Sequence, residues 1–388
     1  MVTLLLFVIY IAYISLGLPD SVFGSAWPVM HGDLGVAVSA AGVFTVITAL
    51  CGAISSFLSG RLIRALGTYK ITVGSILLTV AGLFMVSGSS NFLTTCLAAL
   101  PLGLGAGCID AALNSFVALN FASRHMNWLH GCWGIGATAG PALLSAVIGR
   151  PGGWRTGYRI IGFVQLGIAV IVLASLPLWT AAAKRAQGNA PQEQAAGGRA
   201  LLRMRGVKAA LLVFFVYCGI EYLCGTWAAS YCVHANGLTA ALGARASALF
   251  YLGITVGRLA SGFLSVRASN RALTWGGTAL LGLGIALLLL PGAAPGLLLA
   301  AFLVMGLGCA PLYPCLMHST PRLFGACNAA AVIGMQNGCA LLGGLCMPPL
   351  FGLLAGQAHM GAFPLWVLIL FAVQTACVAR LWHSGNAV

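Results

Sequence analysis

Apolar stretches long enough to cross a bilayer recur along the whole chain, and they decide the class of fold. A transmembrane helix needs about 20 mainly apolar residues. Only 6% of the 388 residues are charged and 60% are hydrophobic, whereas about a quarter of a soluble domain is charged. The sequence therefore predicts an all-α membrane protein with twelve transmembrane helices. We expect them to begin near Thr3, Ala37, Thr68, Phe92, Trp128, Thr156, Val207, Leu242, Ala272, Gly296, Asn328 and Gly361.

One polar segment, residues 181–206, divides the predicted spans into two groups of six. We expect a six-helix bundle over 1–180, a cytoplasmic loop over 181–206 and a second six-helix bundle over 207–388. The fourth and tenth spans share a Gly-Leu-Gly pattern, at 103–105 and 306–308. Two related bundles with a site between them are a recurrent transporter plan, so the halves are predicted to be pseudosymmetric.

The basic residues predict the orientation of the chain, because cytoplasmic loops carry an excess of lysine and arginine. With the N-terminus in the cytoplasm, fourteen basic residues fall inside and four outside. Both termini are therefore expected in the cytoplasm, with the chain in a plasma membrane such as the bacterial inner membrane. The inside set is Arg61, Arg64, Lys70, Arg124, Lys184, Arg185, Arg199, Arg203, Arg205, Lys208, Arg267, Arg271, Arg322 and Arg380, and the outside set is Arg150, Arg155, Arg159 and Arg245.

Several function classes are excluded by what the sequence contains. The net charge of +14 does not indicate nucleic-acid binding, because the basic residues lie at the ends of spans. The thirteen cysteines include no C-x-x-C pair, so we expect neither a redox site nor a bound metal. The chain has no G-x-x-x-x-G-K-[ST] or H-E-x-x-H motif. We therefore predict that it is no enzyme and carries no cofactor.

Three of the five acidic residues lie inside apolar spans. They are Asp20, Asp110 and Glu221, whereas Asp33 and Glu193 fall in polar connections. A carboxylate in lipid is costly, and such residues usually mark a proton, ion or substrate pathway. The sequence therefore predicts a secondary transporter, whose partners are the bilayer, protons and a small-molecule substrate.

Asp110 is the leading candidate for proton coupling. It lies about 17 residues into its span, which puts it near the middle of the membrane at 1.5 Å per residue. Asn114 follows one turn later on the same helix face. Because burial penalises the charged form, such a carboxylate can exchange a proton near neutral pH. The alternative is a structural carboxylate fixed by arginine or backbone donors.

Asp20 and Glu221 are the other two candidates for proton coupling. Asp20 follows Pro19, where we expect the first span to bend; it can share a proton with Asp110 or simply cap a broken helix. Glu221 lies at mid-depth in the seventh span. It either contributes to a proton path or pairs with Arg258 as a structural bridge. Arg258 itself is expected to act as a gate or packing residue.

Polar and aromatic residues in the spans are candidates for substrate binding. His130 can relay protons, because the pKa of imidazole is ordinarily near neutral, or it can be a solvated interface histidine. Gln336 and Asn337 can bond hydroxyl groups or neighbouring helices. Tryptophans can stack on the apolar faces of sugar rings, although interface anchoring and core packing compete. The tryptophans concerned are Trp27, Trp133 and Trp227.

The loop after the second span carries a family pattern. It begins Gly60-Arg61-Leu62-Ile63-Arg64 and continues through Gly67 to Lys70. This resembles the G-x-L-x-D-R-x-G-R-R loop of the major facilitator superfamily, with Arg64 in place of the acid. The resemblance covers the whole chain. It implies alternating access between two bundles, a gating role for Gly60, Arg64 and Gly67, and a monomer.

A closer similarity is to the fucose permease group of sugar–proton symporters. That group has an acid after a Leu-Pro stretch in span one, matched by Asp20, and an acid four residues before an asparagine in span four, matched by Asp110 and Asn114. His130 and Trp133 replace two amides of its span-five pattern. The resemblance implies that Asp20 and Asp110 couple protons to sugar binding.

A competing motif keeps a second function open. Residues 136–141 match the core of the G-x-x-x-G-P element of drug–proton antiporters, which we interpret first as a helix-packing element. The predicted function is proton-coupled symport of a small, neutral, polyhydroxylated solute. The alternatives are a proton-coupled exporter of amphipathic compounds and a non-transporting sensor or scaffold.

Overall fold

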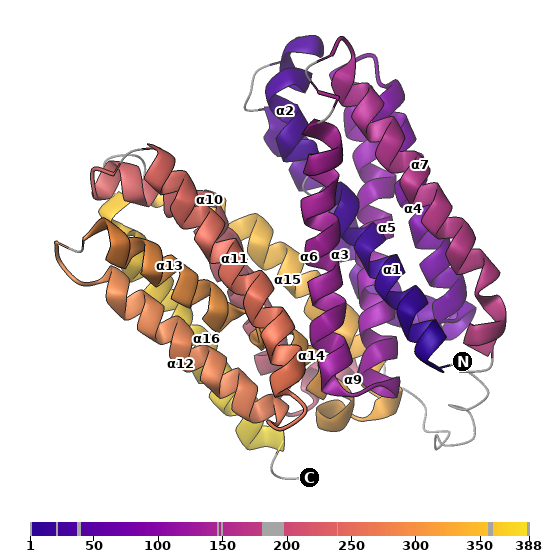
Figure 1. The fold of residues 1–388 in the computed structure, drawn as a ribbon. Coiled ribbons are helices and arrows are strands. Elements are labelled where there is room, and N and C mark those ends of the chain that lie inside the picture. The colour runs from indigo at the N-terminus through magenta and orange to yellow at the C-terminus, as the bar shows by residue number, and fades with distance from the viewer. Residues whose placement is uncertain are drawn as a thin grey trace. The chain divides into compact units, whose positions relative to one another are not determined.

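The computed structural model confirms an all-helical architecture. It describes residues 2–20, 22–36, 40–145, 147–148, 150–180, 198–238, 240–292, 294–355 and 360–385, and within these ranges the regular structure is helical (Figure 1). The helices are α1 (Val2–Asp20), α2 (Val22–Asp33), α3 (Ala41–Leu66), α4 (Thr68–Gly88), α5 (Phe92–Asn120), α6 (Ser123–Ser145), α7 (Gly153–Ala174), α9 (Gly198–Arg203), α10 (Val207–Ser230), η2 (Tyr231–Ala235), α11 (Ala240–Leu264), α12 (Asn270–Leu288), α13 (Pro295–Cys309), α14 (Leu312–Phe324), α15 (Ala326–Ala355), η3 (Met360–Ala362) and α16 (Phe363–Gly385).

Each predicted span corresponds to a helix or to a pair of consecutive helices. The first span is α1 followed by α2, and residue 21 between them lies outside the described residues. The tenth span is α13 followed by α14, interrupted at Ala310 and Pro311, because proline lacks the N–H that continues a helix. The fifth predicted span is α6. This helix begins at Ser123, five residues before the predicted start, so its first turn carries polar residues that the prediction had assigned to a loop.

Helix length and composition support a multi-pass membrane protein. In the described ranges, ten helical segments are long and apolar enough to cross a bilayer. Two further predicted spans fall short of that measure: α6 is more polar, and α11 has only the shorter apolar segment Ala248–Leu264. Within the predicted cytoplasmic loop, residues 181–197 lie outside the described residues, and 198–203 form α9.

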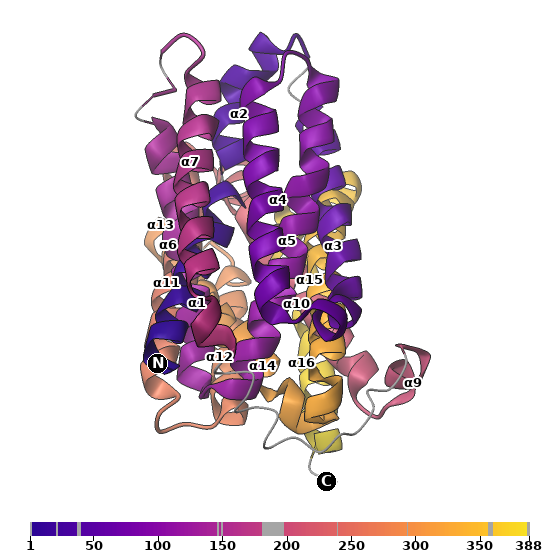
Figure 2. The same cartoon turned by 90° about the vertical axis from the view of Figure 1, so that its right-hand side faces the viewer.

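The chain divides into two compact units. Unit 1 comprises Met1–Asn120, Leu129–Ala195 and Ile333–Gly338, and unit 2 comprises Phe121–Trp128, Ala196–Val332 and Cys339–Val388. In unit 1, α5 packs on α3 and α4, and α4 packs on α7 (Figure 2). In unit 2, α13 packs on α11 and α12, and α12 packs on α16. Corresponding helices therefore pair in the same way in both units, as expected of two related halves.

The Gly-Leu-Gly pattern shared by the two halves explains this common pairing. A Cβ on Gly103 of α5 would meet the backbone of Thr48 on α3, and one on Gly306 of α13 would meet the backbone of Phe250 on α11. Small residues at such positions let transmembrane helices approach closely. The first glycine of each pattern thus sets an equivalent helix contact in its own unit.

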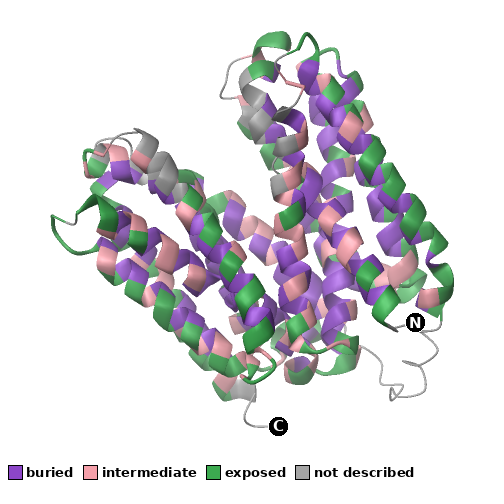
Figure 3. Cartoon of the chain, viewed as in Figure 1, coloured by how far each residue is buried: buried purple, intermediate pink, exposed green. Residues whose placement is uncertain are grey.

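The exposed faces of the helices carry apolar side chains, as in a protein embedded in lipid. Buried residues lie between the helices of each unit, while exposed residues run along outward faces such as that of α7 (Figure 3). The exposed side chains of α7 include Phe163 and Val170, which are 60% and 58% exposed. Lipid tails, unlike water, solvate such a face without penalty.

Candidate functional site

The candidate site is a group of polar side chains around Asp110 in unit 1. Tyr13 of α1 donates its hydroxyl hydrogen to Asp110 Oδ1. Asn114 Nδ2, one turn along α5, donates to the same oxygen at 2.9 Å. Asn337 Nδ2 of α15 donates to Asp110 Oδ2 at 2.8 Å. The half-buried carboxylate is therefore held by uncharged donors from three helices.

His130 extends this group on the α6 side. Asn114 Nδ2 donates to Tyr13 Oη at 3.0 Å as well as to Asp110. The amide oxygen of Asn114, Oδ1, can only accept a hydrogen bond. His130 Nε2 lies 3.1 Å from that Oδ1 and must therefore carry a hydrogen. The Tyr13 and His130 rings also meet edge to face, with centroids 5.3 Å apart. His130 is only 6% exposed, which is inconsistent with a solvated interface histidine.

Close packing of α1 on α6 brings Tyr13 and His130 together. A Cβ on Gly17 of α1 would meet the backbone of Trp133, and one on Gly136 of α6 would meet the backbone of Ile14. Gly140 makes the same kind of contact with the backbone of Leu18. The two glycines of the antiporter-like motif thus serve helix packing, as the sequence interpretation expected first.

Asp20 forms a separate pair at the end of α1. Trp133 Nε1 of α6 donates to Asp20 Oδ2 at 2.7 Å. Asp20 is exposed, and Trp133 is partly buried. The predicted site residues Asp20 and Trp133 therefore contact each other, on the same two helices that contribute Tyr13 and His130.

Glu221 and Arg258 form a buried ion pair in unit 2. Arg258 Nη2 lies 3.4 Å from Glu221 Oε1 and 3.5 Å from the hydroxyl of Tyr217. Glu221 is 7% exposed and Arg258 is 5% exposed. The pairing anticipated by the structural alternative for Glu221 is thus present.

The remaining candidates are placed as follows. Trp227 donates to the carbonyl oxygen of Pro348 at 2.9 Å and packs on the ring of Phe351, which favours the packing interpretation. The backbone of Trp27 lies in α2, but its side chain is outside the described residues. Gln336 is buried in α15 beside Asn337.

The predicted gating residues lie at the end of α3. Gly60 is buried within the helix, while Arg64 is exposed in its last turn. Gly67 has a φ of 81°, a conformation that favours glycine, and it joins α3 to α4. Its conformation explains the glycine that the family pattern has at this position.

Sequence reasoning missed Tyr13. The available signal was its spacing, because Tyr13 precedes Asp20 by seven residues and so lies two turns away on nearly the same helix face.

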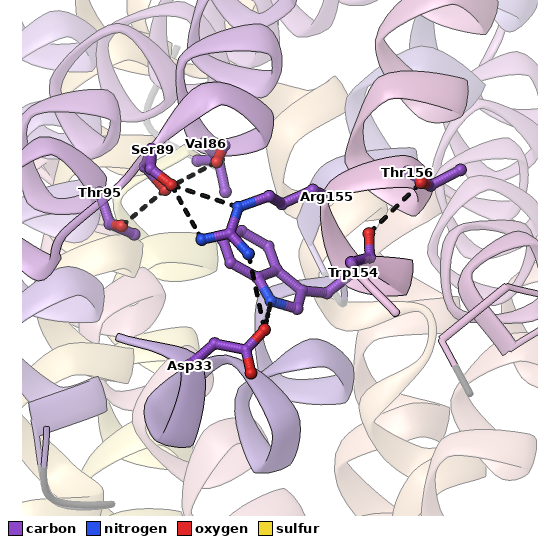
Figure 4. A network of polar contacts seen from close by, with 8 residues as sticks. Asp33, Val86, Ser89, Thr95, Trp154, Arg155 and Thr156 are labelled. Carbon is purple, nitrogen blue, oxygen red and sulfur yellow. Dashed lines mark hydrogen bonds and ion pairs between the residues drawn. The ribbon is translucent and has the colours of Figure 1, made fainter. Parts of the chain in front are cut away.

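A second polar group in unit 1 centres on Asp33, which the sequence analysis treated as an ordinary loop residue. Trp154 Nε1 of α7 donates to Asp33 Oδ2 at 2.7 Å, and Arg155 Nη1 lies 3.5 Å from the same oxygen (Figure 4). Arg155 also donates to the carbonyl oxygen of Ser89, which follows α4. This group ties the end of α2 to α4 and α7.

Comparison with known proteins identifies the family. The model of the Major Facilitator Superfamily matches residues 9–345. The chain belongs to the major facilitator superfamily. It is accordingly a membrane transporter rather than an enzyme.

A yeast protein resembles the chain more distantly. "Bypass of stop codon protein 6" of Saccharomyces cerevisiae is 25% identical over 281 residues, which cover 66% of this chain and 56% of the yeast protein. The chain thus spans little more than half of that relative's length.

Two solved structures share the fold over almost the whole chain. The Escherichia coli fucose–proton symporter FucP has a TM-score of 0.76 at 15% identity, covering 97% of this chain and 98% of that one. The proton–xylose symporter XylE has a TM-score of 0.76 at 11% identity, covering 97% and 94%. At these identities the similarity establishes the fold alone.

Proposed function

We propose that this transporter is a proton-coupled symporter of a small, neutral, polyhydroxylated solute such as a sugar. The observation that carries the proposal is the intramembrane carboxylate of Asp110, hydrogen-bonded by the uncharged groups of Tyr13, Asn114 and Asn337. The two structural neighbours are a fucose–proton symporter and a proton–xylose symporter, which supports the same class of function.

In the proposed mechanism, a proton binds Asp110 and removes its buried charge. The transporter can then change between its outward-facing and inward-facing states at a lower free-energy cost, because no charge must be carried through an apolar environment. The hydroxyl and amide groups around Asp110 can also bond sugar hydroxyls. Asp20, Gln336 and His130 add polar contacts, and Trp133 offers an indole face for a sugar ring.

The proposal includes an orientation and a division of the chain. We place both termini in the cytoplasm of a plasma membrane, such as the bacterial inner membrane, because fourteen basic residues then fall inside and four outside. We assign residues 1–180 and 207–388 to the two six-helix bundles and expect a monomer. Export of amphipathic compounds has no separate support here, because Gly136 and Gly140 are explained by their packing on α1.

The test uses proteoliposomes that enclose a pH-sensitive dye, challenged with a panel of monosaccharides and polyols. Symport predicts proton influx on adding one of these solutes to the wild-type protein, and no influx with Asp110→Asn. Proton efflux on adding a lipophilic cation, with no response to any sugar, would overturn symport in favour of the exporter.

A further inference from the structure

A shallow groove runs between α10 and α15 in unit 2. Its lining consists of Lys208, Leu211, Leu212 and Phe215 of α10 and Cys339 of α15. The four α10 positions follow the i, i+3, i+4, i+7 spacing and therefore share one helix face. The groove is apolar along its length and has a single exposed cation, Lys208, at one end.

The groove fits within one leaflet of a bilayer. Lys208 lies at the start of the apolar segment Val207–Ala228, where a span meets the membrane surface. Phe215 lies seven residues further, which is about 10 Å along the helix axis. One leaflet of the hydrocarbon core is about 15 Å thick, so the groove runs from headgroup level into the acyl region. At its deep end a Cβ on Gly343 would meet the backbone of Phe215, so the two helices are in close contact there.

Positive charge gathers at the mouth of the groove. Arg199, Arg203 and Arg205 precede Lys208 within ten residues, and all four side chains are exposed. In the described part of the chain, none of these four cations has an acidic partner, since the ion pairs there join Asp33 to Arg155 and Glu221 to Arg258. The sequence has 19 basic residues against 5 acidic ones, so the acidic residues of the chain cannot neutralise all of its cations.

The short helix α9 is anchored near the start of α10. Leu201 is buried, and Met204 Sδ accepts a hydrogen bond from Asn328 Nδ2 of α15 at 3.9 Å. Leu202, by contrast, is 40% exposed between the arginines. The segment that carries the cations therefore contacts both helices that form the groove, and it presents one apolar side chain between two arginines of the sequence.

We propose that this groove binds an acidic phospholipid. The phosphate group lies between Arg205 and Lys208, and one acyl chain lies along Leu211, Leu212 and Phe215. Basic clusters next to a membrane span attract anionic headgroups, and an apolar groove that runs about 10 Å from headgroup level fits the upper part of an acyl chain. The inference depends on membrane embedding and not on the transported solute, so it stands or falls separately from symport.

The test counts lipids retained by the purified protein in native mass spectrometry. The protein is released from detergent micelles containing either phosphatidylglycerol or phosphatidylcholine. Wild-type protein is expected to retain phosphatidylglycerol selectively. Each cation near an anionic headgroup favours binding about fivefold, so Arg205→Gln/Lys208→Gln should weaken retention about 25-fold. The matched control Arg267→Gln, an exposed cation outside the groove, should retain the lipid as wild type does.

Two results would overturn the assignment. Equal retention of phosphatidylglycerol by wild type and the double variant would show that these cations do not hold the headgroup. Soluble glycerophosphate carries the headgroup phosphate without acyl chains, and it should fail to displace the lipid. Displacement by glycerophosphate at the lipid's own concentration would show that phosphate alone is recognised and that the groove plays no part.

Discussion

Each unit holds a carboxylate inside an apolar helix, and the hydrogen-bond donors described for the two carboxylates differ in charge. In unit 1, Asp110 accepts hydrogen bonds from Tyr13, Asn114 and Asn337, all of them uncharged groups. In unit 2, Glu221 is paired at 3.4 Å with a buried guanidinium group, that of Arg258. A carboxylate that gains or loses a proton is better held by uncharged partners, because protonation would leave a charged partner buried without its counter-ion.

This difference assigns separate roles to the two acids. A proton on Glu221 would leave the charge of Arg258 buried without compensation, which costs several kcal/mol. A proton on Asp110 leaves its hydroxyl and amide partners uncharged. We infer that Asp110 is the exchanging group and that Glu221 with Arg258 stabilises unit 2.

Replacement of Asp110 should have the largest effect. Asp110→Asn removes the exchangeable proton, so accumulation of solute against its gradient should fall to the level of empty vesicles. Counterflow, which needs no net proton movement, should persist. Accumulation is measured as uptake of labelled solute under an imposed pH gradient. Counterflow is measured as exchange of labelled solute at equal pH.

The control for this variant is Glu221→Met/Arg258→Leu, which removes both charges of the unit 2 pair. It should keep accumulation near the wild-type level. Accumulation by Asp110→Asn but not by this double variant would reverse the two assignments.

Single replacements in the unit 2 pair should cost stability. Glu221→Ala or Arg258→Ala leaves one buried charge unpaired and should lower the free energy of unfolding by about 3–5 kcal/mol. Glu221→Met/Arg258→Leu should recover most of that loss, because no charge remains buried. Thermal unfolding in detergent, followed by circular dichroism, compares the three variants. If the double variant were as unstable as the single ones, packing rather than charge would explain the loss.

Removal of the Tyr13 hydroxyl should have an intermediate effect. Tyr13→Phe deletes the bond to Asp110 and the one from Asn114. Since a hydrogen bond to a charged group contributes about 1.5–3 kcal/mol, coupled uptake should fall at least about tenfold while counterflow changes little. Tyr69→Phe is the matched control, because it deletes a hydroxyl bonded to the Leu173 carbonyl oxygen on the exposed surface of unit 1. Equal losses in both variants would remove Tyr13 from the site.

The ion pair between Asp33 and Arg155 should show the smallest effect. The two side chains are 41% and 29% exposed, so solvent screens their attraction. Asp33→Asn should lower the free energy of unfolding by about 0.5–1 kcal/mol, and added salt should reduce the difference. Salt titrations of thermal unfolding test this, and a loss as large as that of Glu221→Ala would contradict the distinction between exposed and buried pairs.

The order of the helices could be predicted from sequence, whereas much of the site could not. Span starts such as Thr68, Phe92 and Val207 coincide with helix starts, because apolar length and its breaks are local properties. The relation of Asp110 to Asn114 is equally local, being one helical turn. Ser123 was missed as a helix start because its polar neighbours resemble a loop.

Contacts between distant helices were beyond the sequence pattern. The bonds from Tyr13 and Asn337 to Asp110 depend on which helix faces meet, and glycine contacts such as that of Gly17 with Trp133 decide this only in the folded protein. Asp33 was taken for a loop residue for the same reason, since Trp154 and Arg155 lie more than a hundred residues away in sequence.

The most direct test of the assignment is infrared spectroscopy of the purified protein during a pH titration. The carbonyl stretch of a protonated buried carboxyl group is distinct from the bands of a carboxylate. We predict a carboxyl band that titrates in the wild type and in Glu221→Met/Arg258→Leu and is absent in Asp110→Asn. A titrating band that survives in Asp110→Asn and disappears in the unit 2 double variant would contradict the account.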